Sequence, residues 1–316
     1  MAANRHETGI RVQSYRSGSY AAAVSDPGLC AEVRRHCRTV AESARWVEID
    51  ISSSTATSGV DGLDPELHFL DAPTEDVARY VLILDTINFG SGWFPSLRTP
   101  AHESATTTIT RRLTAHARRH EGPWTATELR ALDVRQVAHV LGQEANHPLM
   151  RLYAHALSEL GSWLGNRTAR ETIDAAEGSA ERFAHSLASG MRFFDDTGFW
   201  KRAQITANDL ALAGAADFAD VDRLTAFADN LIPHVLRLDG VLSYAPALAA
   251  LVDTGTCLQA SSPMEVEIRA CAVHACELIA ERLSVPPRTL DNWLWNRGNK
   301  APYRDRPTHL TKTVFY

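Results

Sequence analysis

The chain has 316 residues, a mass of 34.7 kDa and a formal net charge of −6 at pH 7. This length is enough for one large domain or two fused lobes with adequate cores, and the acidic balance argues against a protein that coats a polyanion. No run of about 20 apolar residues is present, so we expect no segment that spans a bilayer.

The cysteine pattern indicates the compartment. The five cysteines form no C-x-x-C pair, and no apolar stretch typical of an export signal is found near the N-terminus. These features predict reduced thiols in a cytoplasmic protein.

In chain order, residues 1–20 are polar and aperiodic, which predicts a flexible N-terminal arm. We expect residues 21–316 to form one mostly helical domain. Its first helix is indicated by apolar residues at three- and four-residue steps from Leu29 to Val40. Residues 76–89 are almost continuously apolar and contain no proline or internal glycine, so they predict a buried helix that includes Asp85.

Further helical patterns cover residues 108–120, 133–142, 147–165, 168–189, 202–214 and 264–283. Alternating runs of strand length are scarce, so the predicted fold class is all-α. In the last pattern Glu267, His274, Glu277 and Glu281 lie opposite an apolar stripe. A solvated acidic face is the favoured interpretation of this row, ahead of a metal site.

The motifs of ATPases, dinucleotide enzymes, zinc proteases and serine hydrolases are missing. Three acids in apolar and aromatic settings remain: Asp85, Asp229 and Asp291. A buried acid is costly unless it is paired, hydrogen-bonded or facing a cavity. Each has a structural alternative: Asp85 can bond backbone or pair with Arg79, Asp229 can cap the next helix, and Asp291 can be the N-cap of a short C-terminal helix.

Six blocks of the sequence resemble the queuosine salvage proteins, the queuosine 5'-phosphate N-glycosylase/hydrolases. They are "ILDTINFGSGWF", "GFWKRAQITANDL", "FADNLIPHVLRLDGVLSY", "EVEIRACAVHACELI", "LDNWLWNRG" and "PTHLTKTVFY". The resemblance implies a helical fold similar to helix-hairpin-helix base-excision glycosylases, and hydrolysis of queuosine 5'-monophosphate to queuine and ribose 5-phosphate. It implies a small nucleotide as partner, and no cofactor, metal, membrane or intact nucleic acid.

The resemblance also implies roles for individual residues. Asp229 corresponds to the catalytic carboxylate, and Lys201 is similar to a lysine that we assign to the sugar-phosphate. The positions that hold the queuine base are His68, Phe227, Asp291 and Trp295. Asp85 and Asn88 belong to a family motif that would form a wall or a support of the site.

Structural alternatives stay open for these residues as well. Lys201 can form a surface salt bridge, the two aromatic residues can be ordinary core residues, and His68 can be a core or loop histidine. The chain departs from the eukaryotic family pattern at Asn230, Leu231 and Asn296, which bears on base and phosphate recognition. Two other functions also stay open: a base-excision glycosylase acting on nucleic acid, and a nucleobase-binding protein without catalysis.

Overall fold

A computed structural model describes residues 28–54, 58–59 and 62–316. The predicted arm, residues 1–20, lies outside the described residues, as does the predicted start of the domain at residue 21. Helices dominate the described chain, and its strands are two or three residues long. The predicted all-α fold class is therefore confirmed, while the likeness to helix-hairpin-helix glycosylases stays a prediction.

The α-helices are α1 (Leu29–Glu42), α2 (Thr74–Thr86), α3 (Ala105–Arg119), α4 (Ala126–Ala131), α5 (Val134–Leu141), α6 (Pro148–Leu164), α7 (Ala169–Asp174), α8 (Ala180–Gly190), α9 (Lys201–Leu212), α10 (Leu231–Leu238), α11 (Pro246–Asp253), α12 (Pro263–Leu283) and α13 (Pro287–Gly298). Short 3-10 helices are η1 (Ile51–Ser53), η2 (Ser91–Ser96), η3 (Arg192–Phe194) and η4 (Val221–Arg223). Strand β1 (Val47–Ile49) pairs antiparallel with β2 (Leu242–Tyr244), with Val47 opposite Tyr244. Strand β3 (Cys257–Leu258) pairs in parallel with β4 (Leu310–Thr311).

Polar side chains fix where several helices begin. In a capping box, the N-cap side chain and the side chain three residues later each bond the other's backbone N–H. Capping boxes start α4 (Thr125 with Glu128), α5 (Asp133 with Gln136) and α7 (Thr168 with Glu171). Proline stands at the first position of α6, α11, α12 and α13, where its missing N–H costs no hydrogen bond.

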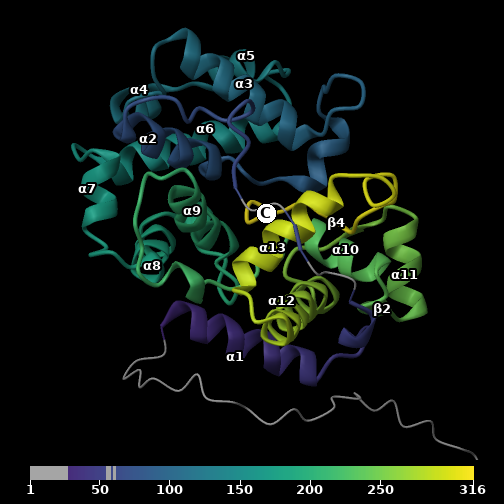
Figure 1. Cartoon of the computed structure of the whole chain (residues 1–316). Coiled ribbons are helices and arrows are strands. Elements are labelled where there is room, and N and C mark those ends of the chain that lie inside the picture. The colour runs from purple at the N-terminus through teal and green to yellow at the C-terminus, as the bar shows by residue number, and fades with distance from the viewer. Residues whose placement is uncertain (1–27, 55–57, 60–61) are drawn as a thin grey trace, which may run out of the picture.

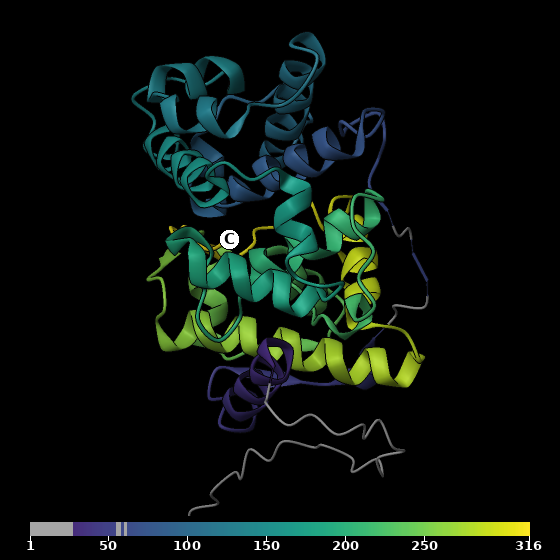
Figure 2. The same ribbon diagram turned by 90° about the vertical axis from the view of Figure 1, so that its left-hand side faces the viewer.

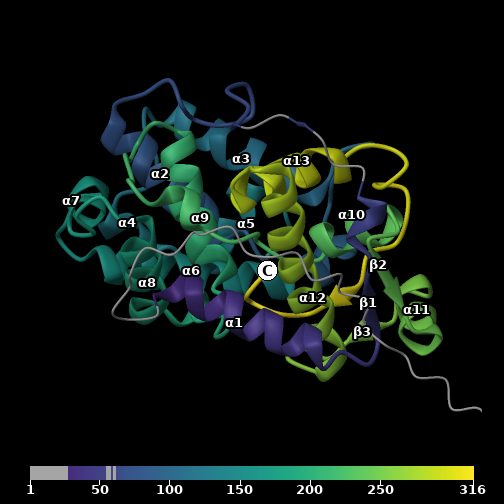
Figure 3. The ribbon, with the colours of Figure 1, turned by 60° about the horizontal axis from the view of Figure 1, so that its bottom comes forward.

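The helices form two groups, which Figures 1 and 2 show from two sides. One group contains α2 to α6, and the other contains α1 and α8 to α13. Helix α9 packs against α2 and α8 and so joins the groups. Figure 3 shows α1 running along the second group, where it packs on α12.

The C-terminal segment runs between these two groups of helices (Figure 2). The backbone oxygen of Tyr316 accepts a hydrogen bond from the Gly90 N–H at 2.8 Å, and its hydroxyl donates to Glu265 Oε1 at 2.8 Å. Gly90 precedes η2 and Glu265 lies in α12, so this one residue links both groups.

One predicted helix is two helices in the structure. The pattern over 168–189 predicts a single helix, but α7 ends at Asp174 and α8 begins at Ala180. Between them Glu177 and Gly178 have φ values of 50° and 74°, a left-handed backbone that no helix continues through. The prediction was wrong because the apolar spacing persists across this break.

The predicted acidic face of α12 is also wrong in part. Glu267 is only 5% exposed, and its Oε1 accepts hydrogen bonds from the backbone N–H groups of Arg45, Trp46 and Val47 at 2.9, 2.5 and 2.8 Å. Glu277 is half-buried and pairs with Arg34 at 2.7 Å. Only the end of the row, at Glu281, is exposed. The apolar period of α12 gave no sign that α1 and β1 cover this side.

The remaining predictions on composition can be compared directly with the structure. The five cysteines are all unpaired. Within the part of the chain that the structure describes, none of the helices combines the length and hydropathy that crossing a bilayer requires.

Candidate active site

Lysine 201 lies at the centre of a cluster of acids contributed by four segments of the chain. It is the first residue of α9 and is 4% exposed, so the surface salt bridge proposed as its alternative is excluded. Its Nζ lies 3.5 Å from Asp229 Oδ2. Burial raises the pKa of Asp85, Asp209 and Asp291, and the charge on Lys201 lowers it again in all three. We call these four acids and Lys201 the acid cluster.

Asp229 is held by the start of α10. Its Oδ1 accepts hydrogen bonds from the backbone N–H groups of Leu231 and Ile232, at 2.6 and 3.3 Å. The predicted helix-capping role is thus present, and it leaves Oδ2 to face Lys201. The Asp229 side chain is 15% exposed. A carboxylate that accepts two N–H bonds beside an ammonium group is arranged as a fixed anion.

A buried arginine fixes the backbone that carries Asp229. Arg269 Nε donates to the Ala228 carbonyl at 3.1 Å. The same guanidinium binds both oxygens of Asp196 at 3.1 and 2.5 Å, and its carbon lies 3.9 Å from the centre of the Phe199 ring. This bidentate pair fixes the guanidinium in one orientation. Contacts of the residue before Asp229 and of the residues after it therefore both fix its position.

Asp291 lies within α13, four residues after the helix begins at Pro287, so its predicted role as an N-cap is wrong. It is 4% exposed, and its Oδ1 accepts the N–H of Phe227 at 2.7 Å. Burial is the main cause that raises its pKa to about 8, and the neighbouring Asp229 raises it further. At pH 7 this carboxyl is therefore mostly protonated.

Two aromatic residues that were predicted to hold the base differ in their exposure. Phe227 is 3% exposed and belongs to the main core, in agreement with its structural alternative. Trp295 follows Asp291 by four residues in α13, a spacing that places both on one face of the helix. Trp295 is 37% exposed, so part of this side chain is open to solvent on the helix that carries Asp291.

Asp85 is 1% exposed, and within the described residues neither oxygen of its carboxylate has a hydrogen-bond partner. Burial raises its pKa well above the usual range, and Asp209 raises it further. The predicted pairing with Arg79 is wrong, because Arg79 binds Glu75 at 3.2 Å and Asp76 at 2.6 Å. Asp85 is thus a buried acid whose charged form is disfavoured.

Arg202 explains why Asp85 gains no arginine partner. Its guanidinium is fully buried and donates to the backbone oxygens of Asp85 and Thr86, at 3.0 and 2.8 Å, and to that of Val314 at 2.9 Å. Burial lowers its pKa to about 10. The guanidinium donates its hydrogen bonds to backbone carbonyl groups, and these bonds join α2 to the C-terminal segment.

Among the described residues, the side chains of two predicted site residues form no hydrogen bond with the acid cluster. In the described chain His68 Nδ1 bonds the Asp64 backbone oxygen at 2.9 Å, and Arg118 of α3 holds the His68 carbonyl at 3.2 Å. Burial lowers the pKa of His68, which keeps it neutral at pH 7. Asn88 is half-buried just after α2, and its N–H bonds the Asp85 backbone oxygen at 3.3 Å.

The sequence interpretation missed two residues of this region. Asp209 lies in α9, eight residues after Lys201, and burial raises its pKa to about 6. The sequence feature that could have identified Asp209 is its spacing of about two helical turns from Lys201. His309 is 2% exposed, and burial lowers its pKa to about 3 against the raising effect of Asp229. It stands in the quoted block "PTHLTKTVFY" without any spacing that ties it to Asp229.

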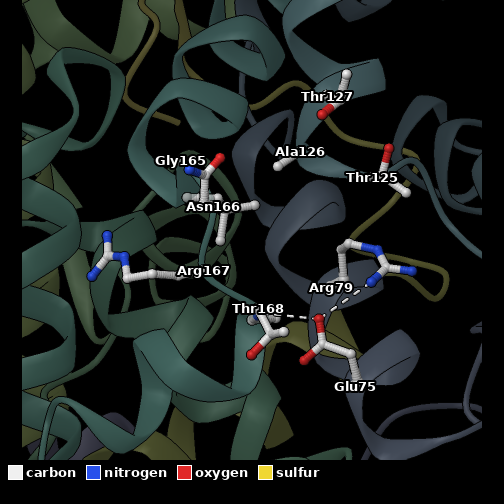
Figure 4. A pocket seen from close by; sticks show the side chains of 11 residues that line it. Glu75, Arg79, Thr125, Ala126, Thr127, Gly165, Asn166, Arg167 and Thr168 are labelled. Atoms are coloured by element: carbon white, nitrogen blue, oxygen red, sulfur yellow. Dashed lines mark hydrogen bonds and ion pairs between the residues drawn. The ribbon is translucent and has the colours of Figure 1, made fainter.

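A separate hollow of about 320 Å³ lies at the other end of α2 (Figure 4). It is lined by Glu75 and Arg79, by the start of α4 and by the loop from Gly165 to Thr168. None of the predicted site residues lines it. Among the residues that the structure describes, no three His, Cys, Asp or Glu side chains are grouped to hold a metal ion.

Comparison with known proteins identifies the family of this chain. A family model described as queuosine salvage protein matches residues 67–316. A Sphaerobacter thermophilus protein named queuosine 5'-phosphate N-glycosylase/hydrolase is 33% identical, with 93% of this chain and 100% of that protein aligned. Proteins of the same name from Dictyostelium discoideum (28% identical; 77% of this chain, 79% of that protein) and Nematostella vectensis (27%; 95% and 97%) also match. The chain therefore belongs to the queuosine salvage protein family.

Proposed function

We propose that this protein hydrolyses queuosine 5'-monophosphate and releases queuine for salvage into tRNA modification. The observation that carries the proposal is the environment of Asp229. Its side chain is 15% exposed, Oδ1 accepts the first N–H of α10, and Oδ2 lies 3.5 Å from Lys201 Nζ. The names of the relatives supply the substrate. The unpaired cysteines support a reducing, cytoplasmic location.

The chemistry requires a fixed anion at the sugar. Breaking an N-glycosidic bond builds positive charge on the anomeric carbon and the ring oxygen, so an adjacent carboxylate stabilises the transition state more than the neutral ground state. At about 4 Å and an effective dielectric of about 20, this attraction is on the order of 4 kcal/mol. Asp229 supplies that charge and also orients the attacking water as a general base.

The base would occupy the side of the cluster formed by α13. Queuine is a 7-deazaguanine, so it lacks the N7 atom through which an enzyme can protonate a guanine leaving group. Asp291, neutral at pH 7, can donate a hydrogen bond to another atom of the base. Trp295 offers its exposed indole for stacking, which contributes about 1–3 kcal/mol per base in nucleic-acid sites. Phe227 forms the buried wall behind them.

The other predicted residues complete the proposed site. Lys201 holds Asp229 and meets the sugar-phosphate, where a compact ammonium group suits a phosphate oxygen. Asp85 and Asn88 form the wall on the α2 side. His68 keeps its ring proton on Nδ1 for the Asp64 carbonyl, so it offers Nε2 to the base as an acceptor. The cationic side arm of queuine would lower the pKa of the carboxyl group that it meets, either Asp291 or Asp85.

Incubation of the purified protein with queuosine 5'-monophosphate, followed by chromatography for free queuine, tests the reaction. The Asp229→Asn variant keeps the size of the side chain and removes the charge, so we expect a loss of about a thousandfold in kcat. Asp253→Asn is the matched control, because Asp253 is 57% exposed and pairs with Arg237 away from the cluster.

Each outcome of this assay has one interpretation. Binding of the nucleotide without release of queuine would support a carrier protein and contradict the proposal. Release of bases from DNA or RNA, with salt-sensitive binding of the polymer, would point to a base-excision glycosylase. Near-normal turnover in Asp229→Asn would remove Asp229 from the catalytic role.

A further inference from the structure

The C-terminal segment lies directly beside the loop that carries Asp229. Asn230 Nδ2 donates to Thr308 Oγ1 at 3.0 Å, which joins the residues that follow Asp229 and precede His309. His309 is 2% exposed, so its ring is enclosed at this junction. Burial lowers the pKa of His309, and the Asp229 carboxylate acts in the opposite direction.

A chain of hydrogen bonds defines the tautomer of His309. Tyr316 donates its hydroxyl proton to Glu265 Oε1 at 2.8 Å. The Tyr316 oxygen is then the acceptor for His309 Nε2, at 3.3 Å. A neutral imidazole that donates from Nε2 carries a lone pair on Nδ1. In the described chain no hydrogen bond occupies that Nδ1.

The residues behind this chain are rigidly held. Glu265 lies in α12, where its Oε2 accepts the Ser261 N–H at 3.0 Å and its Oε1 lies 3.5 Å from Arg269 Nη1. The guanidinium carbon of Arg269 lies 4.5 Å from the centre of the Tyr316 ring. Arg269 also holds the Ala228 carbonyl, so one buried cation positions both Asp229 and the support of His309.

We propose that His309 is a second catalytic residue, whose Nδ1 accepts a hydrogen bond from the water that attacks the anomeric carbon. This inference rests on the proposed hydrolysis. A water bound between Asp229 Oδ2 and His309 Nδ1 would donate one proton to each acceptor, which directs an oxygen lone pair at the sugar. Neutral His309 orients the water, and Asp229 takes its proton.

The bonds and protons balance without a further reactant. The water oxygen bonds to the anomeric carbon while the bond to the base nitrogen breaks, and the base keeps the electron pair. Asp229 gains one proton and later returns it to solvent, and the base nitrogen takes up one proton from solvent. The products are queuine and ribose 5-phosphate.

Two substitutions distinguish the role of Nδ1 from the role of Nε2 in His309. Gln carries an amide group at the distance of Nε2, so His309→Gln keeps the contact with Tyr316 and loses the Nδ1 acceptor. Asn carries its amide oxygen at the distance of Nδ1, so His309→Asn keeps an acceptor for the water. We expect His309→Gln to lower kcat about 100-fold with KM changed less than about twofold, and His309→Asn to retain at least about tenfold more activity.

Tyr316→Phe and Tyr303→Phe provide a matched pair. Each removes one tyrosine–carboxylate hydrogen bond, at 2.8 Å to Glu265 and 2.5 Å to Asp239. Tyr316→Phe frees the tautomer of His309 and should lower kcat about tenfold with KM unchanged, whereas Tyr303→Phe should leave kcat at the wild-type value. Thermal unfolding of all four variants shows whether each is folded at the assay temperature.

Several outcomes would overturn the role of His309 while the hydrolase function stands. They are a wild-type kcat in His309→Gln, equal losses in the Gln and Asn variants, or equal losses in the two tyrosine variants. A rise in KM with kcat unchanged would instead place His309 on a ribose hydroxyl. Absence of queuine release by the wild-type enzyme would contradict the proposed function itself, and this inference with it.

Discussion

The two ends of α2 carry acids with opposite environments. At the N-terminal end, the carboxylate of Glu75 accepts hydrogen bonds from Arg79 at 3.2 Å and from the N–H groups of Ala169 and Arg170, each at 2.9 Å. Near the C-terminal end, the Asp85 carboxylate has no hydrogen-bond partner among the described residues. Glu75 is 30% exposed beside the hollow of Figure 4, whereas Asp85 is buried in the acid cluster.

This difference separates structural acids from candidates for function. Both carboxylate oxygens of Glu75 form hydrogen bonds that stabilise the start of α7 and fix Arg79, which is a structural role. Burial raises the pKa of Asp85 and Asp291 and disfavours their charged forms, which costs stability that the fold does not recover locally. Buried acids with raised pKa values around one lysine are typical of a catalytic site.

The largest expected effect that tests this comparison is removal of the central cation. Lys201→Ala removes the cation that the four acids share and releases Asp229 from its ion pair at 3.5 Å. We expect kcat/KM for queuosine 5'-monophosphate to fall at least about 100-fold. This fall in kcat/KM should be larger for the nucleotide than for the dephosphorylated nucleoside. Equal losses on both substrates would exclude the phosphate role and leave Lys201 as the group that holds Asp229.

The next effect concerns pH and Asp291. Its pKa in the folded protein is about 8, above the ordinary value of 3.8, so the neutral form persists through pH 7 and is lost as the pH rises through 8. If the neutral carboxyl donates to the base, kcat/KM should fall about tenfold per pH unit above 8. Asp291→Asn should remove this alkaline limb, and a limb that survives the substitution would assign it to another group.

How much of this arrangement can be predicted from sequence differs between fold and site. The helical period located most helices, and the family resemblance picked out Lys201, Asp229 and Asp291. The period could not show that Glu267 is buried, because its cover comes from Arg45 to Val47, far away in the chain. His309 was missed for the same reason, since only the fold brings its segment beside Asn230.

At the N-terminal end of α2, Glu75→Gln should lower the free energy of unfolding and leave kcat unchanged. The amide oxygen can replace one acceptor but not both, so at least one N–H of α7 loses its partner. We expect the free energy of unfolding to fall by about 2 kcal/mol, measured by urea denaturation. Glu177→Gln is the control, because Glu177 is 76% exposed in a surface pair. A loss of kcat in Glu75→Gln would contradict the separation of the two ends.

The smallest effect is expected for Asp85→Asn, and its sign should be opposite. The folded-state pKa of Asp85 is raised, so its contribution to stability is fully present below the unfolded pKa of 3.8 and is lost as the pH rises towards the folded value. An asparagine of the same shape does not titrate. We therefore expect Asp85→Asn to be more stable than the wild type by about 1 kcal/mol at pH 7, and to show no such gain at pH 4. Urea unfolding at both pH values measures the difference. A gain of equal size at both pH values would mean that packing, and not the protonation of a buried acid, distinguishes this end of α2.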